Sequence, residues 1–349
     1  MTPDPHATAT ASDLDLAHDP GAREAAERAR ASLAGSVRPI RAAGGGTIRV
    51  GTASWTDPSL TASGVFYPAG GDTPEARLRY YASLFPLVEV DSTYYALPTR
   101  RMGELWLKRT PDHFTFDCKA YALMTGQPTE VLRFPKAIKD ELPATLRQKT
   151  RLYAHELPEE LYDLVWDIFL DAIAPLHSAG KLGSVLLQYP RWFLPGAENR
   201  ENILDSVRRL GDVGCAVELR NALWFSDRNT DRTLAFLGEN DIPFVMVDEP
   251  QGTRSSVPPL LAVTSPRLAV VRFHGRRLAT WEKPNVTAVE RFRYLYDKDE
   301  LRPWVDRIQE ASRAAREVHV IMNNCYANYG TTNAAEMGAL LRAAREEDA

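Results

Sequence analysis

The sequence has no long apolar run, few cysteines and no secretory signal. No stretch approaches the roughly 20 apolar residues that a transmembrane helix needs, so we expect no membrane span. The three cysteines (Cys118, Cys215 and Cys325) lie far apart and form no CxxC motif, which favours reduced thiols over a disulfide framework. The start of the chain lacks the basic and apolar segments of an export signal, so we expect a cytoplasmic protein.

An excess of basic charge is also missing, since 42 Lys and Arg residues face 46 Asp and Glu residues and the formal net charge is −4. Proteins that bind nucleic acid or anionic membranes over a broad surface carry a basic excess, so neither partner is expected from the totals. No GxGxxG or GxxxxGK[ST] sequence follows an expected strand, which excludes the common nucleotide-binding loops. The chain has 349 residues, of which 44% are hydrophobic, so a large core can be buried.

Residues 1–46 differ from the rest because they contain almost no large apolar side chains. Within them, residues 21–33 have the spacing of a surface helix whose seam is mostly alanine. Residues 44–46 are three consecutive glycines and predict a flexible joint. We therefore expect residues 1–46 to be a disordered or loosely docked tail.

Eight short runs rich in β-branched and aromatic residues follow the tail and predict strands. They cover residues 48–55, 87–95, 114–121, 185–190, 215–221, 243–250, 269–276 and 317–324. Segments with helical spacing lie between them, at 74–85, 161–176, 230–239 and 333–345, the last with Thr331, Thr332 and Asn333 as N-cap candidates. Strands that alternate with helices eight times predict an α/β fold, a single (β/α)8 TIM-type barrel over residues 47–345.

The segment between the third and fourth strands, about residues 122–184, is longer than the other connections and is interpreted as an insertion. Its first half is basic, with Arg133, Lys136, Lys139, Arg147, Lys149 and Arg151. Extra length after a barrel strand lies at the carboxyl end of the barrel, where it can cover a site. A solvated basic surface explains the same residues equally well.

Alternation along the strands predicts which side chains face the mouth of the barrel, because residues two apart share a face. Glu89 and Asp91 share one face, as do Glu218 and Arg220, and Arg272 and His274. The opposite faces are apolar and suit the helix layer. Two explanations of these charges stay open, a ligand site and a structural ion pair between Glu218 and Arg272.

The polar strand ends give a candidate site, which we divide by expected role. Glu218, His274, Lys119 and Asp248 are the candidate catalytic groups, because proton transfer needs titratable side chains. The candidate substrate-binding residues are Trp55, Glu89, Asp91, Tyr95, Gln188, Arg220, Trp224, Arg272, Arg276, Asn323 and Asn324. Aromatic residues crowd the same strand ends (Trp55, Tyr94, Tyr95, Tyr121, Tyr189, Trp192, Trp224 and Phe225), as in pockets for small molecules.

Two further kinds of site are considered at these strand ends. Residues 274–277 and 323–334 follow the seventh and eighth strands and favour binding of an anion, through Arg276, Arg277 and backbone N–H groups near Gly330. An ordinary capped helix beside exposed arginines is the alternative. A divalent metal ion at Glu218, Asp248 and His274 is weakly indicated, since the sequence has no HxH or HExxH pair, so we expect no metal or other cofactor.

Several segments together carry a family resemblance. They are GTASW with FYP (66–68), VEVDSTYYALP (88–98), TPDHFTFDCKAY (110–121), KLGSVLLQYP (181–190), VELRNALW (217–224), RFHG (272–275) and NN…NA (323–334). From about Ile48 to Leu341 the chain resembles the YecE-like family, catalogued as domain of unknown function 72. The resemblance implies a TIM-type barrel without an assigned biochemical role.

The resemblance also marks residues, most of them at the polar strand ends. The family pattern falls on Trp55, Tyr67, Glu89, Tyr95, Pro98, Lys119, Gln188, Glu218, Arg220, Trp224, Arg272, His274, Gly275 and Asn324. Two positions depart from it. Asp91 stands where relatives often have Asn, and Gln127 stands where relatives often have a His, which removes a titratable group there.

The leading functional hypothesis is an enzyme that acts by acid–base chemistry on a small anionic or polyhydroxylated metabolite. Glu218 and His274 would transfer protons, while Arg220, Arg272 and Lys119 would hold or polarise the substrate. One alternative is a non-catalytic binding or scaffold protein that contacts nucleic acid or protein through the basic insertion. The other is a divalent-metal-dependent hydrolase. The sequence carries no signal of oligomeric state.

Overall fold

A computed structural model of the chain describes residues 16, 19–33, 38–42 and 44–347. It has two compact units: the first is built from residues up to Glu89 and from Asp231 onward, and the second from Val90–Thr230. All eight predicted strands are present among the described residues, parallel and alternating with helices. The prediction of an α/β fold of the (β/α)8 TIM-barrel type is therefore confirmed.

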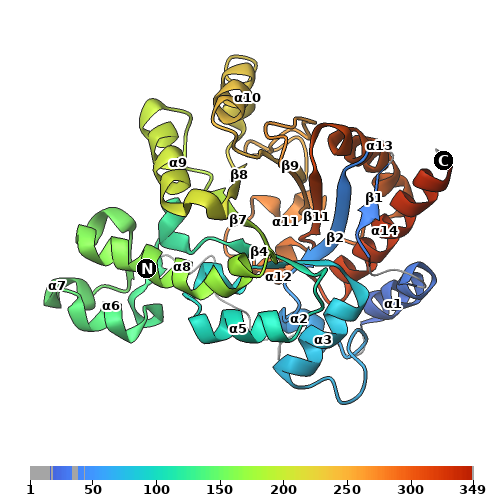
Figure 1. Cartoon of the computed structure of the whole chain (residues 1–349), viewed down its shortest axis with the longest axis horizontal. Coiled ribbons are helices and arrows are strands. Elements are labelled where there is room, and N and C mark those ends of the chain that lie inside the picture. The colour runs from blue at the N-terminus through green and yellow to red at the C-terminus, as the bar shows by residue number, and fades with distance from the viewer. Residues whose placement is uncertain (1–15, 17–18, 34–37, 43, 348–349) are drawn as a thin grey trace. The chain divides into compact units, whose positions relative to one another are not determined.

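The first unit combines elements from both ends of the chain (Figure 1). Its strands are β1 (Ile40–Arg41), β2 (Thr47–Ala53), β3 (Leu87–Val90, up to Glu89), β9 (Val245–Asp248), β10 (Leu268–Phe273) and β11 (Glu317–Met322). Its helices are α1 (Pro20–Leu33), α2 (Pro58–Ala62), α3 (Pro74–Leu84), α10 (Thr230–Glu239), α11 (Leu278–Trp281), α12 (Ala288–Arg291), α13 (Lys298–Ala314) and α14 (Tyr329–Glu347). Its parallel strands are ordered β3-β2-β11-β10-β9, and β1 pairs antiparallel with β2.

The register of the first unit gives its sheet two distinct faces. The outer face lies against α13 and α14 (Figure 1), and Ile48 and Val50 of β2 belong to it. The inner face carries the alternate side chains, among which Ala53, Leu87 and Ile321 form one buried cluster. Side chains alternate along a strand. Residues that are paired in register with this cluster on neighbouring strands therefore also lie on the inner face, as does every second residue from them.

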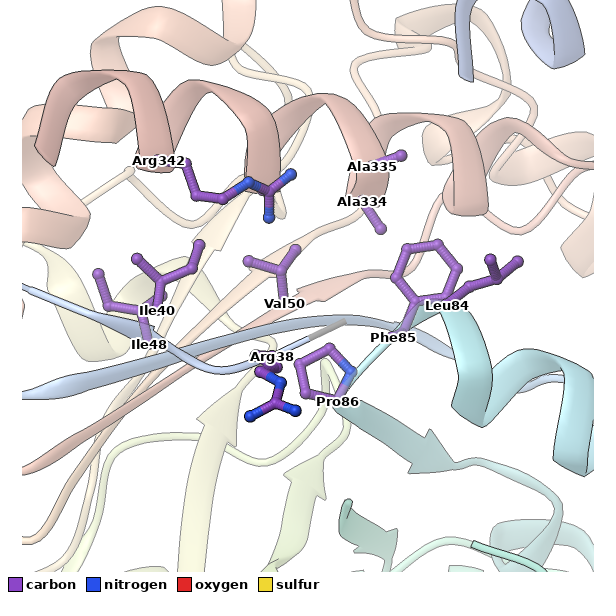
Figure 2. A pocket seen from close by; sticks show the side chains of 11 residues that line it. Arg38, Ile40, Ile48, Val50, Leu84, Phe85, Pro86, Ala334, Ala335 and Arg342 are labelled. Carbon is purple, nitrogen blue, oxygen red and sulfur yellow. The ribbon is translucent and has the colours of Figure 1, made fainter. Parts of the chain in front are cut away.

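A small hollow lies on the outer face, between the β1–β2 hairpin and α14 (Figure 2). Its volume is about 290 Å³ including the solvent that enters it, and it is lined mainly by aliphatic side chains and by Arg38 and Arg342. Burial lowers the pKa of Arg342, which also donates to the backbone oxygen of Ser32. Because the hollow lies on the outer face, it is not at the strand ends where the sequence predicts a ligand.

The helix α1 lies along α14 (Figure 1), and its alanine seam is buried as the spacing predicts. The Arg28 guanidinium donates two hydrogen bonds to the buried carboxylate of Glu336, at 2.9 and 2.8 Å. It also donates to the backbone oxygen of Tyr296. α1 is therefore held on α14 by the Arg28–Glu336 ion pair as well as by its buried alanines. Of the tail expected to be disordered or loosely docked, residues 1–15, 17–18, 34–37 and 43 lie outside the described residues, and the tail boundary at 46 stays a prediction.

The start of α1 is anchored by Asp19. Burial by itself would raise the pKa of this carboxyl, but the Tyr326 hydroxyl, the N–H groups of Gly21 and Ala22 and the Arg293 guanidinium outweigh it, so the pKa lies below its ordinary value. The three glycines expected as a flexible joint form the turn of the β1–β2 hairpin, closed by the Gly45 N–H on the Ala42 oxygen. The end of the tail is thus tied to the sheet.

The second unit holds three parallel strands in the order β4-β7-β8 and a separate two-stranded antiparallel sheet of β5 and β6. Its strands are β4 (Thr115–Lys119), β5 (Thr129–Glu130), β6 (Arg151–Leu152), β7 (Leu182–Tyr189) and β8 (Cys215–Leu219). Its α-helices are α4 (Ser92–Tyr95), α5 (Arg100–Lys108), α6 (Lys136–Glu141), α7 (Ala144–Arg147), α8 (Glu159–Ser178) and α9 (Ala197–Leu210). Its 3₁₀ helices are η3 (Ala122–Thr125), η4 (Val131–Arg133), η5 (Ala154–Glu156), η6 (Gly211–Val213) and η7 (Ala222–Phe225).

Close packing of α5 on α8 organises the outer layer of the second unit (Figure 1). A Cβ atom at Gly103 would lie 2.1 Å from the backbone oxygen of Ala172, so only glycine lets these two helices approach so closely. The helix α8 contains the apolar spacing predicted for residues 161–176, with Val165, Phe169 and Ile173 fully buried. The region interpreted as an insertion is thus tied to the core by a long amphipathic helix.

Among the element boundaries that differ from the prediction, two change the position of named residues. The run 87–95 is a strand only to Val90, because Ser92–Tyr95 turn into α4. The helix α14 begins at Tyr329 rather than at 333, so Thr331, Thr332 and Asn333 lie inside its first turns and do not cap it. Among the described residues no helix is long and apolar enough to cross a membrane.

Candidate functional site

Arg272 and Glu89 form a buried ion pair on the inner face of the first unit. Arg272 is paired in register with Ile321 of the inner cluster, and Glu89 follows Leu87 of the same cluster by two residues. The guanidinium donates from Nε to Oε2 at 2.9 Å and from Nη2 to Oε1 at 2.7 Å. Both side chains are at most 2% exposed. The strand register therefore joins two predicted binding residues that lie 183 positions apart.

His274 lies two residues beyond Arg272 and is fully buried. Its Nδ1 is 2.8 Å from the Nδ2 of Asn323, and rings of Trp281 and Phe292 lie about it at 6.2 and 6.1 Å. An amide nitrogen can only donate, so in this arrangement Nδ1 accepts and the proton of the neutral imidazole is on Nε2. Rotation of the Asn323 amide would instead present an acceptor to a protonated ring. The pair can thus hold both protonation states of His274.

The turn after His274 depends on Gly275, which has φ of +83°. A Cβ atom there would lie 2.6 Å from the Cβ of Tyr294, so a larger residue would displace the tyrosine. The Gly275 N–H donates to the hydroxyl of Tyr296 at 2.8 Å. This turn directs the following residue, Arg276, away from the inner face and toward α13.

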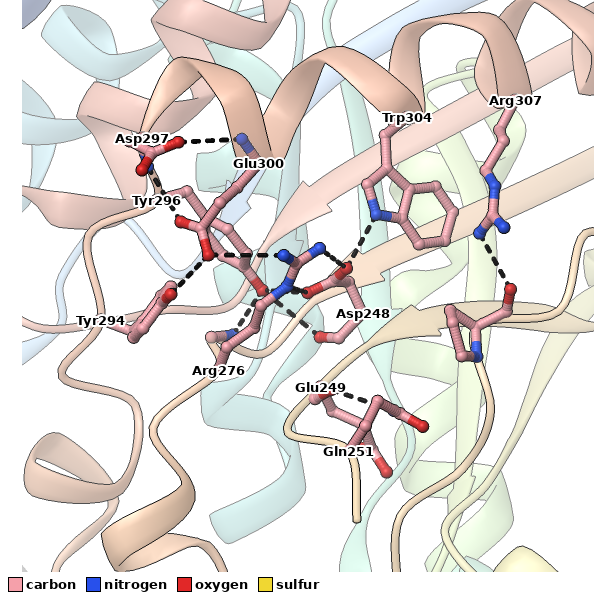
Figure 3. Close-up of polar contacts among 12 residues, drawn as sticks. Asp248, Glu249, Gln251, Arg276, Tyr294, Tyr296, Asp297, Glu300, Trp304 and Arg307 are labelled. Atoms are coloured by element: carbon pink, nitrogen blue, oxygen red, sulfur yellow. Dashed lines mark hydrogen bonds and ion pairs between the residues drawn. The ribbon is translucent and has the colours of Figure 1, made fainter.

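Asp248 has its side chain on the outer face, toward Trp304 of α13 (Figure 3). It is paired in register with Phe273, whose ring contacts that of Trp304. Its carboxylate accepts from Arg276 at 2.9 and 2.7 Å, from the Tyr296 hydroxyl at 2.7 Å and from the Trp304 indole at 2.8 Å. These four hydrogen bonds are those of a structural junction.

The same junction holds Arg276, which the sequence analysis assigned to a ligand. Its hydrogen bonds to Asp248 raise the pKa of the guanidinium, and its Nη1 also contacts Glu300 at 3.3 Å. Burial, together with the neighbouring Asp248 carboxylate, raises the pKa of Tyr296 well above its ordinary value, so the phenol remains a donor. Arg276 is therefore neutralised within the first unit.

Glu249 is a buried carboxylate that the sequence analysis missed. Val247 is paired with Arg272 of the inner face, so Glu249, two residues later, belongs to that face as well. It is 2% exposed, and its Oε1 accepts from the Val257 N–H at 2.7 Å. The alternation of faces, followed from Val247 in the middle of the strand, places Glu249 on the inner face. The sequence prediction instead took Asp248 because it ends the strand.

The loop from β11 to α14 is occupied by contacts within the first unit. Asn324 donates from Nδ2 to the Tyr294 oxygen and to the Asn333 side chain, both at 2.8 Å. The hydroxyls of Thr331 and Thr332 donate to backbone oxygens of Asn328 and Ala25. The hydroxyls of Thr331 and Thr332 are thus engaged in packing α14 and α1.

Trp55 follows β2 in the first unit and is 7% exposed. Its backbone oxygen accepts a hydrogen bond from the Tyr67 hydroxyl, which joins two positions of the family pattern. Nearby Asp57 caps α2 through the N–H of Ser59 at 2.8 Å. Burial raises the pKa of the Asp57 carboxyl, although the Ser59 hydroxyl and N–H act in the opposite direction.

Glu218, Gln188 and Arg220 form a polar cluster in the second unit. Gln188 and Glu218 are paired in register on β7 and β8. The Oε1 of Glu218 accepts from the Gln188 side chain at 2.8 Å and from Arg220 Nη1 at 3.1 Å. The carboxylate is fully buried, while the Arg220 side chain is 12% exposed. Three predicted site residues therefore converge on one carboxylate oxygen.

A second group in this unit surrounds Tyr94. The Lys119 ammonium lies 4.5 Å from the centre of the Tyr94 ring, and the Tyr94 hydroxyl donates to Gln127 Oε1 at 2.8 Å. Gln127 in turn donates to the Gln188 backbone oxygen at 3.1 Å. Burial raises the pKa of Tyr94, so its hydroxyl stays protonated at neutral pH. Gln127 thus links Tyr94 to β7.

Asp91, Tyr95 and Trp224 also belong to the second unit. Asp91 stands at the start of α4 without a side-chain capping bond, and the Tyr95 ring meets the Tyr94 ring edge-on at 4.9 Å. Trp224 is fully buried, and its indole donates to the backbone oxygen of Phe193 at 2.8 Å. Its contacts are those of a packing residue.

Asp117 of β4 is another buried carboxylate that the sequence analysis did not select. It is paired in register with Ser184, whose hydroxyl is 3.2 Å from Asp117 Oδ1. Among the residues that the structure describes, no group of three His, Cys, Asp or Glu side chains is arranged to hold a metal ion.

The fold and these polar strand ends define an α/β protein of the TIM-barrel type, and comparison with known proteins gives its family. The family described as "Protein of unknown function DUF72" matches residues 49–349, so the chain belongs to the DUF72 family. It is similar to UPF0759 protein YunF of Bacillus subtilis, with 31% identity over 303 residues that cover 84% of this chain and 94% of that protein.

Solved structures of DUF72 proteins agree with this assignment. A DUF72 family protein from Enterococcus faecalis matches with a TM-score of 0.67 and 30% identity, over 84% of this chain and 95% of the other. A DUF72 family protein from Thermotoga maritima matches with a TM-score of 0.65 and 29% identity, over 84% of this chain and 99% of the other. The family match begins at residue 49, so it does not include α1.

Proposed function

We propose that the protein is an enzyme that acts by acid–base chemistry on a small polyhydroxylated or anionic metabolite. The observation that carries the proposal is the buried His274 held by Asn323 through Nδ1. Histidine titrates near neutrality, and an amide that can rotate serves it in both protonation states.

The proposed division of roles in the first unit follows from the contacts. His274 is the proton-transfer group, with its Nε2 as the donor of the neutral ring. Asn323 positions the ring, and Glu249 is a second carboxylate on the same inner face. Arg272, paired with Glu89, contributes a fixed dipole rather than a net positive charge.

Charge balance favours the polyhydroxylated class of substrate over the anionic class. Arg272 is neutralised by Glu89, Arg276 by Asp248, and Arg277 contacts Glu290 at 2.9 Å. Anionic ligands need an excess of positive charge or of backbone N–H donors. Hydroxyl groups need donors and acceptors instead, and Asn323, Glu249 and His274 are groups of this kind.

The second unit carries a proton-transfer candidate of its own in Glu218. Gln188 and Arg220 both donate to one of its oxygens, and Lys119 is the other titratable candidate in this unit. We propose Glu218 as a general base or electrostatic stabiliser, with Arg220 and Gln188 as the residues that orient it.

The scaffold alternative is less well supported, because the cations of the basic insertion have partners. Arg133 pairs with Glu130, Lys136 with Asp140, and Lys149 with Glu156. Arg147 donates to the backbone oxygens of Leu142 and Asp140. A surface that binds phosphates offers its cations to the ligand instead.

The test is a thermal-shift screen of the purified full chain against neutral sugars, sugar acids and phosphorylated metabolites, with metal analysis of the same sample. A stabilising ligand is then assayed for turnover with the wild type, His274→Gln, and His155→Gln as a control at an exposed histidine. We expect His274→Gln to lose about 100-fold or more in kcat while ligand stabilisation persists. Turnover at the wild-type rate in His274→Gln would show that the acid–base assignment is wrong.

A further inference from the structure

An exposed apolar surface lies at the ends of β7 and β8 in the second unit. Among the described residues, seven large hydrophobic side chains are exposed, and three of them lie on the two loops that follow these strands. They are Trp192 with 60% of its surface exposed, Leu194 with 47% and Leu223 with 53%. Large apolar side chains that gather on one spot mark interaction sites more often than isolated ones do.

The loop that carries Trp192 is held in place from several sides. The backbone oxygen of Arg191 accepts from the Asn221 side chain. The backbone oxygen of Phe193 accepts from the Trp224 indole, and that of Leu194 accepts from Asn199, both at 2.8 Å. Because side chains hold the backbone on either side of Trp192, its exposure is a fixed feature of the loop.

The buried neighbours of Trp192 leave it no place in the core. Phe193 stacks on Tyr189 at 4.2 Å and on Trp224 at 6.0 Å, with interplanar angles of 22° and 18°. Arg200 covers Trp224 at 5.6 Å. This stack fills the space behind the loop, so the indole of Trp192 is presented outward on a rigid support.

Polar groups lie at the ends of the same two strands. Gln188 and Glu218 are in register, and Arg220 directly precedes Asn221, whose side chain holds the Trp192 loop. Carboxylate, amide and guanidinium groups together donate and accept hydrogen bonds without a net charge. Two members of this cluster, Gln188 and Arg220, are partly exposed and therefore lie on the same two strand ends as the exposed indole.

We propose that Trp192, flanked by Leu194 and Leu223, is a platform for binding the apolar face of a sugar ring. A pyranose has C–H groups on one face and hydroxyl groups around its edge, so it fits a flat aromatic surface beside donors and acceptors. Three side chains are too few for the core of a stable protein interface. A nucleic acid would need unpaired cations as well. The proposal is carried by the second unit alone and does not depend on the proposed enzyme activity.

The seven tryptophans make the test selective, because the other six are at most 7% exposed. Iodide should therefore quench mainly Trp192 in the full-length protein. We expect a neutral sugar from a panel of monosaccharides and disaccharides, at millimolar concentration, to shift the emission to the blue and to reduce quenching. Trp192→Ala should lose the quenchable emission and weaken sugar binding, measured by calorimetry, by about tenfold or more.

Two matched variants separate stacking from simple loss of surface. Trp192→Phe should retain sugar binding within a few-fold, and Leu132→Ala, at an exposed leucine elsewhere in the second unit, should bind like the wild type. The proposal is overturned if no sugar protects Trp192 or if Trp192→Ala binds as well as the wild type. It is also overturned if protection depends on protein concentration, which indicates self-association, or if only nucleotides protect.

Discussion

At the scale of single residues, charges on the inner face of the first unit are held in a fixed geometry. Glu89 and Arg272 meet through two hydrogen bonds with almost no solvent exposure. Removing two charges from water costs free energy, which is recovered only if the pair stays intact. The folded state therefore depends strongly on both partners.

We predict that Arg272→Met lowers the free energy of unfolding by about 3–5 kcal/mol, because it leaves the Glu89 carboxylate without its guanidinium. The double variant Glu89→Leu with Arg272→Met should recover much of this loss. Chemical denaturation monitored by circular dichroism measures both. Arg267→Met is the control, because its ion pair with Asp241 is about half exposed and should contribute less than about 1 kcal/mol. Equal losses in the two single variants would contradict the prediction.

At the scale of elements, α1 extends the hydrogen-bond network of the family domain. Glu336 of α14 accepts from Arg28 and also from Asn333, at 3.0 Å. Asn333 in turn accepts from Asn324 at 2.8 Å. A helix that precedes the family match at residue 49 thus completes a polar chain that reaches a predicted site residue.

We predict that Arg28→Gln destabilises the docked helix by about 2 kcal/mol, because the buried Glu336 carboxylate loses a charged donor. Amide hydrogen exchange should increase in residues 20–33 and in the first turns of α14. Arg30→Gln, at an exposed position of the same helix, should change the free energy of unfolding by less than about 0.5 kcal/mol. Unchanged exchange in Arg28→Gln would show that the alanine seam alone holds α1.

At the scale of the whole molecule, the chain returns to its beginning to complete the first unit. β2 near the start pairs in parallel with β11 near the end, with Ile48 beside Val318. The second unit is formed by the residues between β3 and α10. Charge is balanced over the chain, with a formal net charge of −4, and the cations of the basic insertion have local partners.

This balance predicts no salt-dependent retention of the protein on nucleic acid at physiological ionic strength. Retention should be measured at several salt concentrations for the wild type and for the triple variant Arg133→Gln, Lys136→Gln, Lys139→Gln. If these residues bound phosphates, the slope of affinity against salt would fall by about one per residue. We expect no change in slope. A decrease of that size would instead favour the scaffold alternative.

Much of the fold could be predicted from the sequence because its signals are local. Runs of β-branched and aromatic residues predict all eight strands, and the spacing of Val165, Phe169 and Ala172 predicts α8. Alternation also selects Arg272 and His274 as residues that share a face. It failed at β9, where Asp248 was chosen because it ends the strand although Glu249 has the inner-face position.

The amino-acid sequence by itself determined the strands, most helices and the alternation of polar and apolar side chains, because each depends on residues only a few positions apart. Only the tertiary structure decided that Arg272 pairs with Glu89, since that contact depends on strand order and register across four strands. It likewise decided that Trp224 is buried while Trp192 is exposed. Both tryptophans follow a strand, and which one faces solvent depends on the packing behind the loop.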